Sequence, residues 1–288
     1  MRRKRRGLMI FLIILLVLAL ITAALIYDSN TRIVTTEYEL FYPKLPESFD
    51  GYRIVVLADI HGAEFGKDNE RLIKHVKEAK PHIIAIVGDF IDHNTGKPVE
   101  KQLEIAETLV ETLVTIAPVY YVTGNHEWDK SLGGPWALLN MLDEHGVHIL
   151  RNKFTRLESG GASIILAGTD DPNGPADMMK PRELVAKIRE AADNDFIVML
   201  EHRNYNIELY SGLGLDLVIC GHAHGGIIRL PFTDGLLGQQ RDWFPKNTSG
   251  VVTVGDTNTL VSRGLGNTMG IPRLLNNPQV VVAVLRTG

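Results

Sequence analysis

The sequence has 288 residues, of which 45% are hydrophobic, with one cysteine and a formal net charge of −4. Basic residues at positions 2–6 contribute +5, which leaves −9 for residues 7–288. An acidic body without a basic, aromatic-interleaved patch argues against a nucleic-acid-binding protein. Cys220 has no second cysteine to pair with, and its place in an apolar run predicts a buried, unreactive thiol.

The N-terminal segment has the composition of a membrane anchor. Residues 7–27 contain no charged side chain, and as an α-helix they would span roughly 30 Å, about one hydrocarbon core. The basic cluster predicts a cytoplasmic segment at 1–6, a transmembrane signal anchor at 7–27 and a body outside the cytoplasm. A cleaved signal peptide is the alternative, but its apolar region is normally only ~7–15 residues long. We therefore expect a single-pass protein of the cell membrane.

The rest of the chain reads as one α/β domain. Residues 28–52 are polar, with Pro43, Pro46 and Gly51, and are expected to form a linker leading into a domain at 53–288. Apolar runs predict strands at 53–58, 82–87, 119–122, 147–150, 163–168, 196–200, 215–220, 251–254, 259–262 and 279–286. Helical spacing is found at 68–80, 99–117, 135–145 and 181–192. This alternation is typical of layered α/β folds.

Five of the predicted strands end in side chains that can bind a metal ion. In chain order these are Asp59 and His61, Asp89, Asn125 and His126, His202, and His222 and His224. Each short motif is common by itself, but the ordered set is not. Side chains just past strand ends converge at one edge of an α/β sheet. His222 and His224 are flanked by glycines, and in extended backbone both imidazoles would point the same way.

This ordered set, D-x-H, GD, GNH, H and GHxH, closely resembles the calcineurin-like metallophosphoesterases. Residues 221–226, 228–231 and 262–266 are similar to the exported or membrane-anchored bacterial phosphodiesterase branch of that family. The resemblance covers about residues 35–286 and implies a four-layer α/β/β/α sandwich with a two-metal site. The chain departs from the pattern at Ile227, where relatives often have glutamine, and after His202, where a proline-containing turn is usual.

The resemblance also implies a role for each residue. One metal ion would be held by Asp59, His61, Asp89 and His224. Asp89 would bridge to a second ion, held also by Asn125, His202 and His222. His126 would contact the substrate, and we assign it as the catalytic residue that protonates the leaving group.

The chemistry of these residues agrees with that division. Asn125 and His126 are adjacent, so in extended backbone their side chains would point apart, one toward a metal and one toward substrate. A histidine-rich set with two carboxylates suits manganese, iron or zinc better than calcium or magnesium. Asp92 and Glu127 are candidate acceptors for the second nitrogen of metal-bound imidazoles.

The expected activity is hydrolysis of phosphomonoesters, phosphodiesters or pyrophosphate bonds by metal-activated hydroxide, as in a phosphodiesterase or phosphatase. An anchored body makes lipid-linked or cell-envelope phosphates candidate substrates. A metallopeptidase motif would need a histidine where Lys130 stands, and residues 62–68 lack the spacing and the Ser/Thr of a P-loop. A non-catalytic docking or scaffold module on the same fold is the remaining alternative.

Residues 227–246 contain many large apolar side chains in a connection that begins beside the proposed ligands. The simpler interpretation is that these side chains pack over the sheet edge as core. The alternative is a lip beside the substrate that receives an acyl chain or touches the bilayer.

Overall fold

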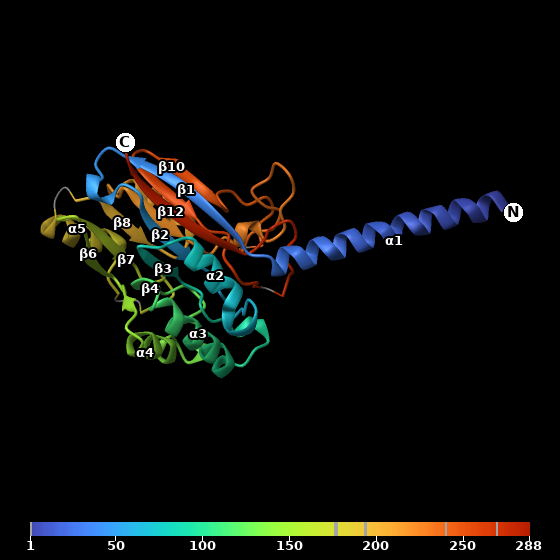
Figure 1. The fold of residues 1–288 in the computed structure, drawn as a ribbon, viewed down its shortest axis with the longest axis horizontal. Helices are drawn as coiled ribbons and strands as arrows, with labels where there is room; N and C mark the ends of the chain where they lie inside the picture. The colour runs from blue at the N-terminus through green and yellow to red at the C-terminus, as the bar shows by residue number, and fades with distance from the viewer. Residues whose placement is uncertain (1, 176–177, 193–194, 240, 269) are drawn as a thin grey trace.

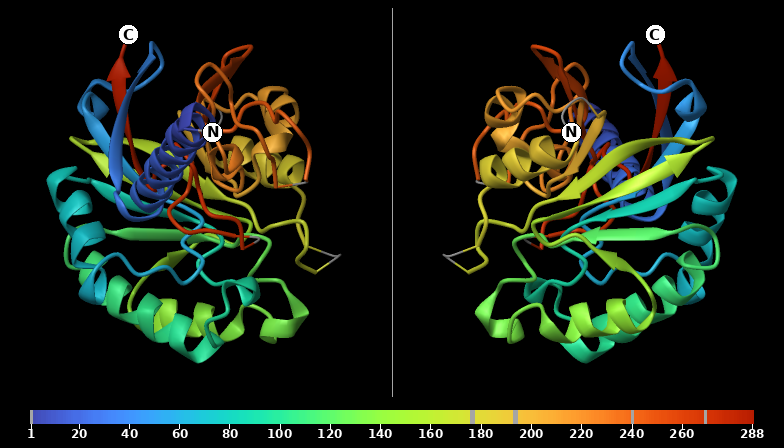
Figure 2. Two further views of the ribbon diagram at one scale, coloured as in Figure 1. Left: turned by 90° about the vertical axis from the view of Figure 1, so that its right-hand side faces the viewer. Right: turned by 90° about the vertical axis from the view of Figure 1, so that its left-hand side faces the viewer.

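Two six-stranded sheets face each other, and helices cover their outer faces (Figures 1 and 2). The computed structural model describes the whole chain except residues 1, 176–177, 193–194, 240 and 269. The predicted four-layer α/β/β/α sandwich is confirmed, and it is preceded by one long N-terminal helix.

The first sheet supplies three of the strands that carry predicted ligands. Its order is β1 (Val34–Tyr42), β12 (Gln279–Thr287), β2 (Tyr52–Leu57), β3 (Ile83–Val87), β4 (Val119–Val122) and β5 (His148–Ile149). β2 to β5 run parallel to one another. The outer face of this sheet is covered by α2 (Glu70–Glu78), α3 (Val99–Leu113) and α4 (Trp136–Glu144).

The second sheet supplies the other two ligand-bearing strands. Its order is β10 (Gly250–Val254), β11 (Thr257–Val261), β9 (Leu217–Cys220), β8 (Ile197–Leu200), β7 (Ala162–Gly168) and β6 (Lys153–Ser159). β11, β9, β8 and β7 are parallel, and the outer strands β10 and β6 are antiparallel to their neighbours. α5 (Pro181–Ala191) and α6 (Ile207–Ser211) pack on its outer face, where Cys220 is buried as predicted.

The central strands are buried on both faces, which explains their unbroken apolar sequences. In β2, Ile54 and Val56 pack between the two sheets, whereas Val55 and Leu57 pack under the helices. This alternation follows from the two-residue period of a strand. Packing on both faces fixes the position of each strand end, and therefore of the loop that follows it.

The expectation of a linker over 28–52 is wrong for most of that range. Val34–Tyr42 forms β1, which pairs in parallel with β12 at the edge of the first sheet. Its exposed and less exposed residues alternate, because one face of this edge strand is in solvent. The other strand that was not predicted, β6, is also a sheet edge with mostly exposed or half-buried residues.

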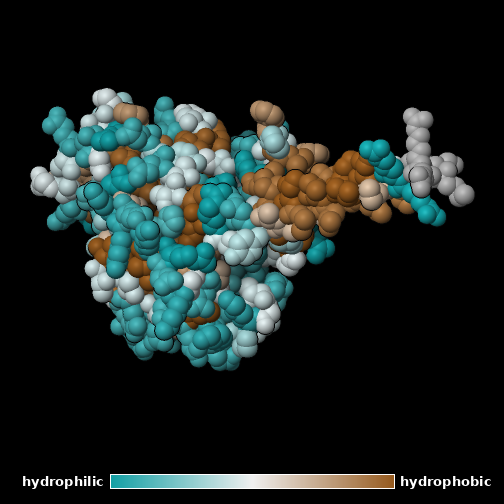
Figure 3. Space-filling model, turned by 45° about the vertical axis from the view of Figure 1, so that its right-hand side comes forward, coloured by the Kyte–Doolittle hydropathy of each residue, from teal (hydrophilic) through white to brown (hydrophobic). Residues whose placement is uncertain are grey.

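The N-terminal helix α1 (Arg2–Thr31) projects from one end of the body (Figure 1). Within the described residues, its segment from Arg5 to Thr31 is the one helix long and apolar enough to cross a membrane, and its most apolar window is not buried against the body. On the face shown in Figure 3, the helix presents a continuous apolar surface next to a mainly polar body. The helix ends at Thr31 and β1 begins at Val34, so the helix leads almost directly into the first sheet.

Candidate metal centre

The predicted ligands lie in loops at the carboxyl ends of five strands taken from both sheets. Asp59 and His61 follow β2, Asp89 follows β3, Asn125 and His126 follow β4, His202 follows β8, and His222 and His224 follow β9. Contacts between loops of the two sheets join them: the backbone N–H of His222, for example, donates to Asp59 Oδ1 at 2.9 Å. The strand ends therefore meet at one edge of the sandwich, as the sequence predicts.

Several of these residues have a left-handed backbone. φ is 51° at Asp59, 50° at His61, 52° at Asp89, 68° at His222 and 46° at His224. Non-glycine residues rarely adopt this region, and such strain gathers at functional sites. The expectation of extended backbone at 222–224 is thus wrong. The sharp turn sends the two imidazoles into different clusters of side chains.

The first cluster consists of Asp59, His61 and His224. His61 Nε2 lies 3.0 Å from His224 Nε2, which in turn lies 3.4 Å from Asp59 Oδ1. All three residues are buried, and one ligand atom of each lies within 4.8 Å of the others. Two imidazole nitrogens this close need a proton or a cation between them.

The second cluster consists of Asp89, His202 and His222. His202 Nε2 lies 3.1 Å from Asp89 Oδ2 and 3.3 Å from His222 Nδ1. The same Asp89 Oδ2 lies 3.8 Å from His61 Nε2 of the first cluster. Asp89 therefore stands between the two clusters, the position of a carboxylate that could serve two ions at once.

Asn125 and His126 occupy a turn rather than extended backbone, because Asp129 N donates to His126 O at 3.0 Å. Their side chains nevertheless have different surroundings. Among the residues that the structure describes, the buried Asn125 Oδ1 has no hydrogen-bond partner. His126 is 15% exposed, and its Nε2 lies 3.9 Å from Asp89 Oδ2.

One buried carboxylate, Asp92, supports two of the histidines. Its Oδ2 lies 3.1 Å from His61 Nδ1 and its Oδ1 lies 2.8 Å from His126 Nδ1. A carboxylate at one ring nitrogen fixes the tautomer and leaves the other nitrogen to face the site. His202 is oriented in a similar way, with Nδ1 at 2.9 Å from the carbonyl oxygen of Val87. Asp92 thus has the supporting role that the sequence suggests.

Glu127 has a different role from the predicted one. Its carboxylate accepts hydrogen bonds from the backbone N–H groups of Asp89 at 3.0 Å, Phe90 at 2.5 Å and Gly124 at 2.7 Å. It therefore ties together the loops after β3 and β4 instead of an imidazole. These loops approach so closely that a Cβ added at Gly124 would lie 2.3 Å from Asp89 Oδ1.

Sequence reasoning missed Arg273, which lies far along the chain in a loop without a motif. Its guanidinium is buried, donates to the carbonyl oxygen of Gly266 at 2.6 Å and lies 3.2 Å from His224 Nδ1. Burial lowers the pKa of Arg273 to about 10. Arg273 therefore packs against the ring of a predicted ligand on the side away from the first cluster.

The chain departs from the family pattern at two places near the site, one apolar and one held by an ion pair. Ile227 is buried and contributes no polar group. After His202, Arg203 pairs with Asp171 through two contacts, one of them at 2.7 Å, and donates to the Tyr205 hydroxyl. The ring of Tyr205 lies 5.8 Å from that of His222. An ion pair thus holds the segment where a proline-containing turn is usual.

The electrostatics of the site favour positive charge among the carboxylates. Burial disfavours the charged form of Asp89, but His202, His126 and His61 hold the pKa of Asp89 well below its usual range. Burial also works against the charged form of His202, yet Asp89 and Asp59 raise the pKa of His202 to about 10. Burial and the neighbouring His202 lower the pKa of His222 to about 3. The negative charge of Asp89 and Asp59 therefore stabilises a cation at this position, whether a proton on His202 or a metal ion.

The donor set fits divalent ions. Two carboxylates and several imidazole nitrogens converge there, and these are ligands that manganese, iron and zinc accept. The amide oxygen of Asn125, which has no hydrogen-bond partner among the described residues, is a further candidate ligand. The inward-facing imidazole nitrogens lie 3.0 Å and 3.3 Å apart, close enough to share an ion.

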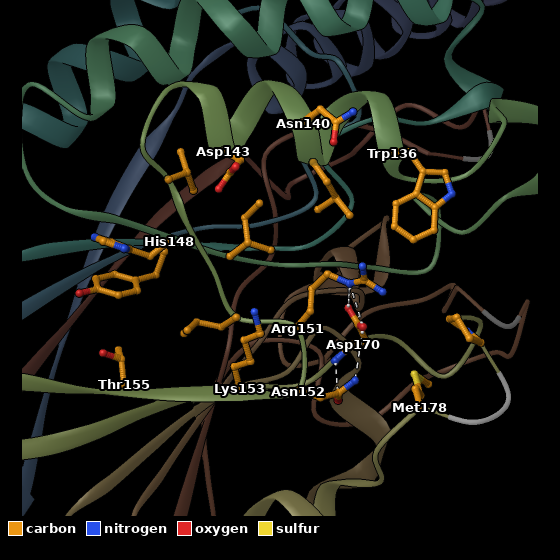
Figure 4. Close-up of a pocket in the computed structure, with 16 residues that line it drawn as sticks. Trp136, Asn140, Asp143, His148, Arg151, Asn152, Lys153, Thr155, Asp170 and Met178 are labelled. Atoms are coloured by element: carbon orange, nitrogen blue, oxygen red, sulfur yellow. Dashed lines mark hydrogen bonds and ion pairs between the residues drawn. The ribbon is translucent and has the colours of Figure 1, made fainter.

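Two cavities differ in their relation to this centre. A small one of about 150 Å³ reaches His222 and is lined by Tyr205 and Lys246. A larger one of about 800 Å³ lies between α4 and β6, where Arg151 pairs with Asp170 (Figure 4). It contains none of the predicted ligands. Of these two cavities, only the small one is lined by a predicted ligand, His222.

Paired sheets with two adjoining histidine–carboxylate clusters at the strand ends define the metallophosphoesterase class of two-metal hydrolases. Residues 52–226 match the family model of the calcineurin-like phosphoesterases. The chain belongs to this family.

Its relatives include an uncharacterised metallophosphoesterase of Bacillus subtilis, YkuE, which is 26% identical over 91% of this chain and 88% of its own length. A transmembrane protein with a metallophosphoesterase domain from Danio rerio is 29% identical over 66% of this chain, and the match spans only 44% of that relative. Among solved structures, the NAD nucleotidase of Haemophilus influenzae matches 74% of this chain and 45% of its own, with a TM-score of 0.50 and 13% identity. That likeness shows the fold alone.

Proposed function

We propose that the protein is a membrane-anchored, dinuclear-metal-dependent phosphoesterase that hydrolyses phosphomonoester, phosphodiester or pyrophosphate bonds. The observation that carries the proposal is the place of Asp89, whose Oδ2 lies 3.1 Å from His202 Nε2 and 3.8 Å from His61 Nε2. One carboxylate oxygen within reach of both clusters suits a bridging ligand.

In this proposal Asp59, His61, Asp89 and His224 hold one ion, and Asp89, Asn125, His202 and His222 hold the other. Two divalent ions, manganese, iron or zinc by the donor set, supply an activated water and Lewis acidity toward the phosphoryl oxygens. The remaining work falls to residues of the chain, which must orient the phosphate and deliver a proton to the leaving oxygen.

His126 is the residue proposed for proton delivery. Its Nδ1 lies 2.8 Å from Asp92 Oδ1, so the ring is held in one orientation with Nε2 toward the centre. Burial disfavours its charge, but Asp92 and Asp89 raise the pKa of His126 to about 9. A protonated, partly exposed imidazole beside the centre is suited to act as a general acid.

The membrane part of the proposal rests on α1 and on the basic residues before its apolar span. We propose that α1 remains attached as a signal anchor, with residues 1–6 in the cytoplasm and the domain outside. Phosphates that are lipid-linked or belong to the cell envelope would then be within reach.

The test uses the full-length protein purified in detergent, stripped with a chelator and reloaded with Mn²⁺, Fe²⁺ or Zn²⁺. The reloaded samples are assayed against 4-nitrophenyl phosphate, bis(4-nitrophenyl) phosphate and pyrophosphate. We expect hydrolysis of at least one of the three, saturating at two ions per chain. A folded protein that binds two ions and hydrolyses none of the three would favour the docking or scaffold module instead.

A further inference from the structure

The connection that begins at the metal ligands carries exposed apolar side chains rather than a packed core. Ile227 is buried, but Phe232 is fully exposed and Trp243 and Phe244 are 68% and 61% exposed. Leu230, in the same connection, is also exposed. Leu275 is exposed in the adjoining loop, directly after Leu274, which bridges to Ile228. We call Leu230, Phe232, Trp243, Phe244 and Leu275 the apolar rim. The interpretation of this connection as ordinary core is therefore wrong for its aromatic residues.

Hydrogen bonds connect the segment that carries the apolar rim to the C-terminal end of α1. Ile228 forms an isolated bridge with Leu274, and Arg229 N donates to Leu274 O at 2.9 Å. The neighbouring Arg273 binds α1 through its backbone: Arg273 N donates to Asn30 Oδ1 at 3.0 Å, and Asn30 Nδ2 donates to Arg273 O at 2.9 Å. Figures 1 and 2 agree in placing this connection at the end of the body from which α1 leaves.

The small cavity is bordered both by the predicted ligand His222 and by the segment that follows the aromatic residues of the apolar rim. Pro245 and Lys246, which directly follow Trp243 and Phe244 in the chain, line it together with His222. Its volume of about 150 Å³ is small against the ~300–1,000 Å³ of a typical ligand pocket. Its lining includes the cationic Lys246 as well as the carboxylate of Asp242, and its volume suits a phosphate-sized polar group but not the chains of a lipid.

The composition of the rim fits the headgroup region of a bilayer. Trp is enriched at membrane interfaces, and Trp, Phe and Leu together form the buried face of segments that lie in the headgroup region. Arg241 and Lys246 are exposed within the same connection and suit anionic headgroups, although Asp234 and Asp242 are exposed there as well. Other exposed apolar residues, such as Phe41 and Trp136, are not part of this connection and are unremarkable for a protein surface.

We propose that the apolar rim lies in the headgroup region of the bilayer that α1 crosses, and that the cavity at His222 receives the phosphate of a lipid whose chains stay in the membrane. The substrate half of this inference rests on the proposed phosphoesterase function. The contact of the rim with the bilayer does not depend on that function.

Bilayer contact is tested by tryptophan fluorescence of the full-length protein in vesicles that contain phosphatidylcholine with brominated acyl chains. Trp243→Phe removes the tryptophan of the rim, and Trp136→Phe is the matched control, because Trp136 is also exposed but lies on α4. We expect bromolipid to quench the wild type and the Trp136→Phe variant, and the quenching to be largely lost in Trp243→Phe. Equal quenching of Trp243→Phe and wild type would overturn the membrane contact.

The substrate half is tested with two diesters that share one leaving group. Hexadecyl 4-nitrophenyl phosphate is presented in vesicles, and methyl 4-nitrophenyl phosphate is presented in solution. In the Trp243→Ser/Phe244→Ser double variant we expect KM for the hexadecyl ester to rise about tenfold, because two apolar side chains no longer enter the bilayer. KM for the methyl ester should be unchanged. A Trp136→Ser variant should match wild type on both esters.

Each alternative result points to a different failure. Equal rises in KM for both esters would show that the rim supports the cavity structurally, which overturns the lipid substrate. An unchanged KM for the hexadecyl ester in the double variant would overturn it as well. No turnover of either ester by the metal-loaded wild type would count against the proposed function, while the quenching result would still decide the membrane contact.

Discussion

Asp92 Oδ1 lies 2.8 Å from His126 Nδ1, and this contact fixes which ring nitrogen of His126 can face a substrate. The other oxygen of Asp92 lies 3.1 Å from His61 Nδ1, so a single carboxylate supports a proposed metal ligand and the proposed acid. Substitution of Asp92 should therefore affect both metal binding and proton delivery, whereas substitution of His126 should affect proton delivery alone.

His126→Ala should slow alkyl phosphoesters strongly and nitrophenyl phosphoesters little. An alkoxide leaves poorly without a proton, whereas nitrophenolate leaves unaided, and a general acid is worth ~10²–10⁴-fold in rate. The measurement is kcat/KM on a matched alkyl and aryl ester, with metal content determined alongside. If both esters slow by the same factor, His126 binds phosphate and does not protonate the leaving oxygen.

Asp92→Asn should lower both activity and metal affinity, because His61 and His126 lose the same support. Loss of a supporting carboxylate typically costs about 10–100-fold in metal affinity or activity. Competition with a metallochromic chelator measures the affinity of the variant and of wild type. Wild-type affinity in Asp92→Asn would contradict a supporting role toward His61.

Asp89→Asn should deplete both ions, whereas His222→Ala should deplete mainly one. The reason is position: Asp89 Oδ2 lies within 3.8 Å of His61 Nε2 and 3.1 Å of His202 Nε2, while His222 belongs to the second cluster alone. Elemental analysis of the purified, metal-loaded variants gives the ratio directly. Two full equivalents retained by Asp89→Asn would exclude a bridging role.

Gly124→Ala should damage the site by crowding rather than by loss of a ligand. The added Cβ would lie 2.3 Å from Asp89 Oδ1, so the loops after β3 and β4 must separate. We expect lower metal affinity and a loss of about 1–3 kcal/mol in the free energy of unfolding. Gly212→Ala is the control, because its Cβ would meet nothing closer than 3.6 Å. Equal behaviour of the two variants in thermal unfolding and metal titration would refute the crowding argument.

The anchor can be tested in cells. Full-length protein should sediment with membranes, and protease added to cells freed of their wall should degrade the body. A soluble product that begins near Ala24 would establish cleavage of the N-terminal segment instead.

The strands that could be predicted from the sequence are those whose residues all lie in the same environment, the buried core. β3, β8 and β9, and β2 after Arg53, are buried on both faces, so their sequences are apolar runs that end just before the predicted ligands. β1 and β6 lie at sheet edges, and their mixed polar sequences resemble loops.

The finer geometry of the site was less accessible from the sequence. The expectation of extended backbone at His222 and His224 failed because φ there is 68° and 46°. Arg273 was missed because tertiary folding alone brings it within 3.2 Å of His224 Nδ1. Both features depend on contacts between distant loops, which no local pattern encodes.

The short connection from α1 to β1 leaves little flexibility between the N-terminal helix and the α/β body. α1 ends at Thr31, β1 begins at Val34, and Asn277 Nδ2 donates to the carbonyl oxygen of Asp28 at 2.8 Å, so the last turn of the helix is held against the domain. Helices in membranes respond to bilayer thickness by tilting. Because α1 is held rigidly against the domain, a tilt of the helix would also rotate the candidate metal centre relative to the membrane plane. In the proposed anchored enzyme, bilayer thickness would therefore influence which phosphates the site can reach, and the search for them would be confined to the two dimensions of the membrane.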